Sequence, residues 1–429
     1  MLNHRNWLAT ATAVAAFTLT ACGGGGNSAG TASVRLVNAT LTHSSLSLLA
    51  NSAIVVPATP VDTVSAYVGV TAGSPALQIN DATTSAALVT LAPSLGGGGH
   101  YVLVTYESGS SLRNTIINED VAAPAVGTAS VRIFDAATDA GGIDVFITDP
   151  AVDLATLTTP TVSFGSSTAL QTSSSLSLAP GTYRIRVTGA GNTSDLRLDI
   201  LSVTIANQEV GSIMLTPTIG GTLVNGSVIA QQADYLAARN TNARVRLAAA
   251  VTNGATVSAS AGATPIGAGV SPSVSAYALV PAASVLNVSV NAASVGAPAT
   301  ALVAGSDSTL FIYGAASAAS ARLIIDDNHL PTTTTNLKLR LVNGLTGAGA
   351  TPLTMDAAFA VIASNIAPGT ASAYAVVASS TALRVDVFST SVLAPIYSDP
   401  ALSLPGNAVY TLFMLGDASA PIPLLRKDR

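Results

Sequence analysis

Hydrophobic and polar side chains alternate with a period of two along much of the chain. The clearest case is residues 337–341, where Leu337, Leu339 and Leu341 alternate with Lys338 and Arg340, and residues 195–200 alternate in the same way. Because successive side chains of a strand point to opposite faces, this pattern predicts strands with one buried and one solvent-exposed face. Gly, Pro, Asn and Ser separate such segments every ~8–12 residues, which predicts an all-β chain of antiparallel sandwiches.

The composition supports a β-rich, folded chain. Apolar residues make up 49% of the 429 residues, charged residues only 9%, and the formal net charge is −5. The abundant β-branched residues argue against disorder, and 36 Gly with 21 Pro argue against a helical chain. The acidic balance without a basic cluster argues against nucleic acid as a partner.

The chain contains four copies of one pattern. Each copy opens on an alternating stretch with an arginine, and these stretches cover residues 32–38, 129–135, 243–247 and 337–343. The four arginines, Arg35, Arg132, Arg246 and Arg340, lie 97, 114 and 94 residues apart, a spacing typical of domains and not of solenoid repeats. We therefore expect Ig-like β-sandwich domains over residues 31–127, 128–240, 241–334 and 335–429, the last two being degenerate.

Further landmarks follow each opening stretch in the same order. A Ser-Ala-Tyr segment ends at Tyr67, Tyr277 and Tyr374, which lie 32, 31 and 34 residues after their arginines, and the second copy lacks this tyrosine. A late apolar strand comes next, and the first and third copies close on acidic segments at residues 118–120 and 326–328.

In their order and spacing, these landmarks resemble a bacterial family, the domain of unknown function 4397 (DUF4397). The best matches are residues 34–39, 65–73, 131–136, 143–146 and 179–183. The resemblance covers most of residues 31–240 and, more weakly, residues 241–429, where the segment that matches 143–146 is missing. It implies an exported or surface protein, and it brings no activity with it.

The N-terminal residues resemble a bacterial lipoprotein signal. Arg5 supplies positive charge, an apolar run extends from Trp7 to Leu19, and residues 19–22, Leu-Thr-Ala-Cys, form a lipobox. The run is too short to span the ~30 Å of a bilayer's hydrocarbon as a helix. We expect a signal peptide over residues 1–21, cleavage between Ala21 and Cys22, lipidation of Cys22, and a flexible tether over residues 22–30. The alternative is an ordinary secretory leader with a chance cysteine.

The lipobox predicts where the chain resides and what holds it there. Gly23 follows Cys22, where an aspartate would indicate retention at the inner membrane. The predicted location is the bacterial cell envelope, as an outer-membrane lipoprotein that faces the periplasm or the cell surface. The membrane is its expected partner, through the lipid on Cys22. Because Cys22 is the only cysteine, no disulfide can form within the chain.

No catalytic or cofactor-binding constellation is evident. His43, His100 and His329 lie in separate copies without metal-ligand spacing, and no Gly-x-Ser-x-Gly marks a nucleophile. The run Gly96–Gly99 lacks the Gly-Lys-Ser/Thr of a phosphate-binding loop. We expect no enzymatic activity and no cofactor.

The acids that close two copies are the best metal candidates. Glu119, Asp120, Asp326 and Asp327 could supply calcium's oxygen ligands where domains meet. Alternatively they form solvated turns whose side chains bond the local backbone, an interpretation favoured by the absence of a known calcium-loop order. Asp135, Asp139 and Asp144 are a weaker set, expected at the ends of one hairpin.

Two repeated residue types each allow two interpretations. The arginines could form a row of anion contacts, or they could pair with cross-strand acids and cover the sheet with their aliphatic stems. The tyrosines could line a sugar-binding surface, or they could pack in the sandwich with the hydroxyl on a turn carbonyl. The sequence predicts a lipid-anchored envelope protein with a structural or adhesive role. The alternative is a surface binding module for glycan, peptide or calcium.

Overall fold

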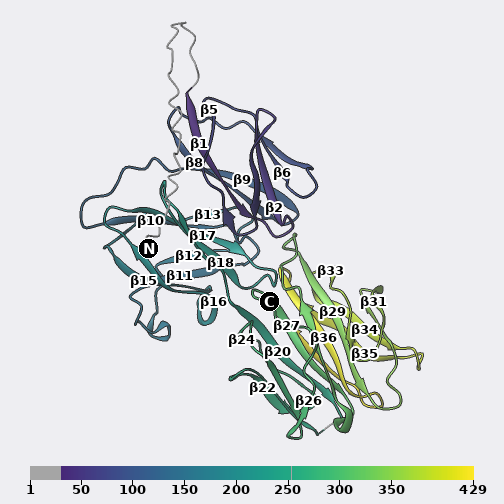
Figure 1. Cartoon of the computed structure of the whole chain (residues 1–429). Helices are drawn as coiled ribbons and strands as arrows, with labels where there is room; N and C mark the ends of the chain where they lie inside the picture. Colours follow the sequence, from purple (N-terminus) through teal and green to yellow (C-terminus); the bar gives the residue numbers. More distant parts are fainter. Residues whose placement is uncertain (1–29, 253) are drawn as a thin grey trace, which may run out of the picture.

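The computed structural model describes residues 30–252 and 254–429 (Figure 1). Their strands form eight sheets, and these pair into four sandwiches, so the predicted all-β class of tandem sandwiches is confirmed. Two short 3-10 helices, η1 (Leu154–Thr156) and η2 (Ala316–Ala318), interrupt the strands. None of the described helices is long and apolar enough to cross a bilayer. The predicted signal peptide, Cys22 and the tether up to residue 29 lie outside the described residues.

Each sandwich has one sheet that faces a neighbouring sandwich, here named the pairing sheet, and one outer sheet. In the first sandwich the pairing sheet consists of β4 (Thr63–Val64), β5 (Val68–Thr71), β1 (Thr31–Ala39), β8 (His100–Ser108) and β9 (Ser111–Asn118), and the outer sheet of β3 (Ala53–Pro60), β2 (Ser45–Ala50), β6 (Leu77–Asp81) and β7 (Ala87–Leu91). In the second, the pairing sheet consists of β13 (Gln171–Thr172), β14 (Leu176–Leu178), β10 (Ala129–Asp135), β17 (Val210–Pro217), β18 (Val224–Ala230) and β19 (Tyr235–Ala238), and the outer sheet of β12 (Val162–Phe164), β11 (Ile143–Thr148), β15 (Gly181–Gly189) and β16 (Asn192–Ile205).

The third and fourth sandwiches repeat this plan. In the third, the pairing sheet consists of β23 (Ser273–Val274), β24 (Ala278–Pro281), β20 (Asn242–Val251), β27 (Asp307–Gly314) and β28 (Ser320–Asp326), and the outer sheet of β22 (Thr264–Val270), β21 (Thr256–Ala261), β25 (Leu286–Val290) and β26 (Ala293–Val295). In the fourth, the pairing sheet consists of β32 (Thr370–Ala371), β33 (Ala375–Ala378), β29 (Asn336–Thr346), β36 (Ala408–Asp417) and β37 (Ile422–Lys427), and the outer sheet of β31 (Ala360–Ile366), β30 (Leu353–Ala357), β34 (Ser380–Ser389) and β35 (Pro395–Leu404).

The ladders are not all antiparallel. In every sandwich the first strand runs parallel to a late strand of its pairing sheet: β1 to β8, β10 to β17, β20 to β27 and β29 to β36. A parallel pair needs a long crossover connection, and the strands of the outer sheet provide it. For the same reason β10 and β11 lie in different sheets, so the expectation that Asp135, Asp139 and Asp144 end one hairpin is wrong.

The alternating pattern does place one set of side chains in each core. Leu337, Leu339 and Leu341 are buried inside the fourth sandwich. The opposite face of the same strand is buried as well, because Lys338 is 7% and Arg340 2% exposed. The prediction of a solvent-exposed polar face is therefore wrong for this strand, since a neighbouring sandwich covers it.

The sandwiches associate as two pairs through their pairing sheets (Figure 1). Between the first and second sandwiches, Val37 and Val104 pack with Phe134 and Met214. Between the third and fourth, one apolar cluster holds Ala248, Ala250, Val274, Phe311, Val342, Phe413 and Leu415. This second set of side chains points away from the sandwich cores, so each pairing sheet carries two apolar surfaces.

A glycine turn joins the two pairs. Gly220 and Gly221, between β17 and β18, lie against the third sandwich, where the Gly220 amide donates to the Gly305 carbonyl at 2.9 Å. The Asn328 amide donates back to the Gly220 carbonyl at 3.2 Å. Gly221 has a φ of +84°, and any Cβ there would collide with the backbone of His329. Only a residue without a side chain permits this approach.

The close approach of β29 to the third sandwich is expected to tolerate no side chain at Gly344. A Cβ at this position would lie 2.5 Å from Leu415 Cδ2, 2.7 Å from Ala250 Cβ and 3.1 Å from Phe311 Cζ. We predict that Gly344→Ala lowers the free energy of unfolding by about 1–3 kcal/mol, the usual cost of overpacking. Urea unfolding followed by circular dichroism measures it.

Gly296→Ala is the matched control, because a Cβ there meets nothing within 4 Å. Equal urea midpoints for the two variants would contradict the packing described at Gly344.

Candidate functional site

The interface between the third and fourth sandwiches encloses two arginines and two aspartates. Arg246 and Arg340 are each 2% exposed, and the Asp326 and Asp428 side chains are fully buried. The pairs are exchanged between sandwiches: Arg246 of the third donates to Asp428, and Arg340 of the fourth donates to Asp326. Each arginine therefore has its hydrogen-bonded carboxylate only while the sandwiches stay together, although Arg246 also lies 3.5 Å from Asp326 of its own sandwich.

Tyrosines and threonines complete this arginine–carboxylate–tyrosine cluster. The Arg246 guanidinium lies 4.7 Å from the ring centroid of Tyr277, and that of Arg340 lies 4.5 Å from Tyr374, both cation–π distances. The Tyr277 hydroxyl donates to Asp326 at 2.5 Å, and the Tyr374 hydroxyl donates to Asp428 at 3.1 Å.

The threonines bond to both charged partners. Arg246 Nε donates to Thr309 at 2.8 Å, and Thr309 donates to Asp326 at 2.7 Å. Thr411 takes the same place beside Arg340 and Asp428. The two halves of the cluster thus repeat one arrangement, as expected when two copies of one fold meet face to face.

Asp326 is ionised despite its burial. Burial raises the pKa of the Asp326 carboxyl, but the Arg340 and Arg246 guanidiniums outweigh it and hold that pKa below its ordinary value. Burial together with Asp326 raises the pKa of Tyr277 well above its ordinary value, so the phenol keeps its proton and donates it. Charged and fully hydrogen-bonded groups of this kind set a unique geometry between two sheets.

The first pair of sandwiches contains half of this arrangement. Arg35 is 3% exposed and bonds Glu119 of its own sandwich, with its Nε 2.9 Å from Oε2. Its guanidinium lies 4.7 Å from the ring centroid of Tyr67, whose hydroxyl also donates to Glu119. From there Arg35 reaches the second sandwich and donates to the Ala233 carbonyl at 2.7 Å and the Ala230 carbonyl at 3.2 Å.

The second sandwich has lost its half. Arg132 is exposed, Ser175 stands two residues after the repeated serine where the other copies have tyrosine, and Gln231 stands at the position of the acid. The Gln231 amide instead exchanges two hydrogen bonds with the backbone of Val121, at 3.1 and 2.9 Å. A neutral amide pair thus replaces an ion pair at the equivalent position.

The four calcium candidates all face basic side chains. Glu119 and Asp326 belong to the clusters described above. Asp120 lies 2.9 Å from the His100 imidazole. Asp327 lies 2.7 Å from the His329 imidazole and 2.5 Å from Lys338 Nζ. Among the described residues no three His, Cys, Asp or Glu side chains gather as a metal site. A calcium ion would therefore have to displace an arginine, a histidine or a lysine.

The histidine side chains bond carboxylates and not nucleophiles. His43 lies 2.9 Å from Asp81, and His100 and His329 face Asp120 and Asp327. Within the described ranges, no serine or threonine hydroxyl is hydrogen-bonded to any of these three imidazoles. These histidines therefore form acid–imidazole pairs that hold local turns, without the nucleophile that acyl transfer requires.

Sequence reasoning missed three features of the site. It anticipated arginines paired with acids, yet Arg246 and Arg340 pair across sandwiches. It placed the tyrosine hydroxyls on turn carbonyls, yet those of Tyr67, Tyr277 and Tyr374 meet carboxylates. It also overlooked Asp428, because the fourth copy closes on Arg-Lys-Asp-Arg and not on an acidic run. Alignment of all four closing segments by distance from the late strand would have found it.

The repeated serine before each tyrosine has a structural role. The hydroxyls of Ser65, Ser275 and Ser372 accept from the amides of Leu36, Leu247 and Leu341, at 2.9 to 3.0 Å. In each case the serine lies where the edge strand is interrupted, so its oxygen supplies the acceptor that a regular ladder would provide. Ser173 does the same for Ile133 in the second sandwich, which kept the serine and lost the tyrosine.

The N-terminal part of the described chain is similar to a known domain family. Residues 32–146 match the family model of the domain of unknown function DUF4397. The resemblance predicted from the sequence is therefore confirmed over the first sandwich and the first two strands of the second. The DUF4397 segment contains Arg35, Tyr67 and Glu119, so a complete half of the cluster lies within it.

The chain was also compared with solved structures and with curated proteins. A crystal structure of a protein described as a putative cell adhesion protein from Bacteroides uniformis is 12% identical in sequence. The similarity covers 47% of this chain and 98% of that one, with a TM-score of 0.21. No curated protein matches the chain.

Loss of one buried arginine is predicted to destabilise the second pair strongly. In Arg340→Met, Asp326 loses its main partner and stays buried as a carboxylate, which costs about 3–5 kcal/mol of unfolding free energy. Arg132→Met is the control at the equivalent position of the repeat, where exposure predicts a change within about 0.5 kcal/mol. Thermal and urea unfolding measure both, and a small effect of Arg340→Met would refute the assigned importance of the cluster.

Asp135 occupies a position where two other copies have asparagine. The Asn38 amide donates to the carbonyls of His43 and Thr59, at 3.2 and 3.0 Å, and Asn343 makes two equivalent bonds. An ionised carboxylate cannot donate. Burial raises the pKa of the Asp135 carboxyl to about 7, so the folded chain holds this proton at a pH where the unfolded chain has lost it.

This substitution gives a pH-dependent prediction. The stability contributed by protonated Asp135 is complete below about pH 4 and is lost as the pH rises through about 7. Asp135→Asn keeps a neutral donor at every pH, so it should raise the thermal midpoint at pH 8 and leave it nearly unchanged at pH 4. Melting curves from pH 4 to 8 test this, with the exposed Asp149→Asn as control. An equal gain at both ends would contradict it.

Proposed function

We propose that this chain is a lipid-anchored protein of the bacterial cell envelope with a structural or adhesive role and no catalysis. The observation that carries the anchor is the lipobox at residues 19–22, followed by the glycine-rich tether and then by sandwiches from residue 31 onward. Acyl chains on Cys22 hold the chain at the membrane, since each buried methylene contributes ~0.8 kcal/mol. The absence of aspartate after Cys22 favours the outer membrane.

The structural role is supported by how the sandwiches pair. Their interfaces bury arginines whose hydrogen bonds are complete only in the paired state. We therefore expect each pair to move as one rigid body and not as two independently mobile domains. A rigid body on a flexible tether presents distant surfaces at a defined spacing from the membrane. The described side chains carry acid–imidazole and acid–arginine pairs in place of a nucleophile and base.

The anchor is tested by labelling cells with an alkyne analogue of palmitate. The wild-type chain should take up the label and sediment with the outer membrane in a density gradient. Cys22→Ser should take up none, while Ser28→Ala, which changes only the tether, should behave like wild type. A wild-type chain without label, or an equally labelled Cys22→Ser chain, would refute the lipid anchor.

A further inference from the structure

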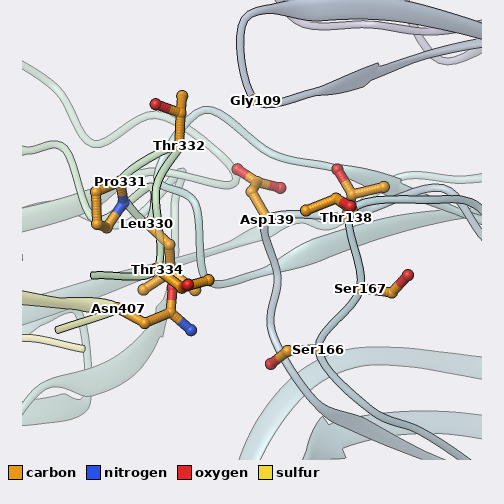
Figure 2. Close-up of a pocket in the computed structure, with 11 residues that line it drawn as sticks. Gly109, Thr138, Asp139, Ser166, Ser167, Leu330, Pro331, Thr332, Thr334 and Asn407 are labelled. Atoms are coloured by element: carbon orange, nitrogen blue, oxygen red, sulfur yellow. The ribbon is translucent and has the colours of Figure 1, made fainter. Parts of the chain in front are cut away.

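All four sandwiches contribute to one hollow where the two pairs meet. Its wall includes Gly109 from the β8–β9 turn of the first sandwich and Thr138 and Asp139 from the β10–β11 loop of the second. Thr332, between β28 and β29, and Asn407, between β35 and β36, close the other side (Figure 2). The hollow has a volume of about 380 Å³, and a second hollow of about 390 Å³ adjoins it through Thr138, Asp139 and Thr332. Small-molecule sites typically measure about 300–1,000 Å³ and favour domain interfaces.

The wall is rich in groups that both donate and accept hydrogen bonds. Hydroxyls of Thr138, Ser166, Ser167 and Thr332 line the hollow together with the Asp139 carboxylate and, on the opposite side, the Asn407 amide (Figure 2). The Thr138 and Ser167 hydroxyls donate to carbonyls of the protein, at 2.7 and 3.0 Å. Ser167 also accepts from the Ala169 amide at 3.0 Å, so each hydroxyl retains at least one lone pair that can accept from a ligand. Leu330 and Pro331 add an apolar ledge.

The charges around the hollow are balanced. Asp139 Oδ2 lies 3.3 Å from His329 Nε2, and His329 in turn pairs with Asp327, which pairs with Lys338. Burial lowers the pKa of the His329 imidazole, but Asp327 and Asp139 outweigh it and raise that pKa above its ordinary value. Arg429 and Glu107 add one further charge of each sign beside Asp139, so three carboxylates face three cations. The contact of His329 Nε2 with Asp139 is an ion pair and not a hydrogen bond, because its geometry is unsuitable for one.

These features select among ligand classes. An anion or a metal ion has no uncompensated charge to bind. A peptide strand has no ladder to join, because turns, loops and linkers form this wall. A neutral polyol fits, since each of its hydroxyls can donate to a carboxylate or amide oxygen and accept from a hydroxyl or an amide. Its C–H face can lie on Leu330 and Pro331.

We propose that this hollow binds a neutral sugar unit, held by Asp139, Asn407 and the surrounding hydroxyls. This site goes beyond the structural role and needs no anchor. Because its walls come from both pairs, a bound sugar would also fix the angle between them.

The test uses the full chain, purified in a detergent without a sugar headgroup. The probes are hexoses, N-acetylhexosamines and their neutral disaccharides at up to 10 mM, measured by saturation-transfer-difference NMR, with putrescine as the cationic probe. At least one saccharide should bind, and Asp139→Asn and Thr332→Val should each weaken it tenfold or more. The exposed Asp234→Asn and Thr90→Val should bind like wild type.

Thermal unfolding confirms that each variant is folded before its binding is compared. No binding across the panel, equal binding by all variants, or binding of putrescine alone would overturn the proposal. A chain without lipid that binds sugar would refute only the anchor, and a lipidated chain that binds no sugar would refute only this site.

Discussion

The arrangement of the four sandwiches depends on the burial of arginine between facing sheets. A guanidinium removed from water loses several kcal/mol of hydration, and only a well-placed carboxylate with full hydrogen bonding offsets this loss. In the second pair that carboxylate comes from the neighbouring sandwich, for Arg246 from Asp428 and for Arg340 from Asp326. Within its own sandwich Arg246 has only Asp326 at 3.5 Å, and the carboxylates that accept the arginines' hydrogen bonds lie across the interface, so pairing stabilises both sandwiches.

The same constraint explains how the copies have diverged. In the first pair, Arg35 bonds to Glu119 of its own sandwich, and in the second sandwich it donates only to backbone carbonyls. Arg35 needs no acid from the second sandwich, and there Arg132 lies exposed and a glutamine occupies the position of the acid. One charged half-cluster is enough to hold the first pair together, because the apolar contacts around Phe134 and Met214 provide the remaining stabilisation of this interface.

Much of the fold could be predicted from the sequence, because alternation within a strand is a local property. The leucines at 337, 339 and 341 identify a strand and its core face without further information. The fate of Arg340 could not be predicted in this way, since the sheet that covers it belongs to a copy about 90 residues earlier. The hollow between the two pairs could not be predicted from the sequence either, because its lining residues are spread from Gly109 to Asn407 and share no motif.

The parallel ladder between the first strand and a late strand of each pairing sheet also sets the order in which the molecule can assemble. Of the described strands, β1 is synthesised first. Its partner strand β8 comes much later, since Tyr101, which pairs with Val34, lies 67 residues further along the chain. Ala233, whose carbonyl accepts from Arg35, lies 198 residues after that arginine. Each sandwich can therefore fold only after nearly all of its own residues have been synthesised, and each pair can form only after both of its sandwiches have been synthesised. Such long-range closure is slow and leaves apolar edges open meanwhile. Only 9% of the residues are charged, so few charged side chains are available to protect these open edges from pairing with other chains.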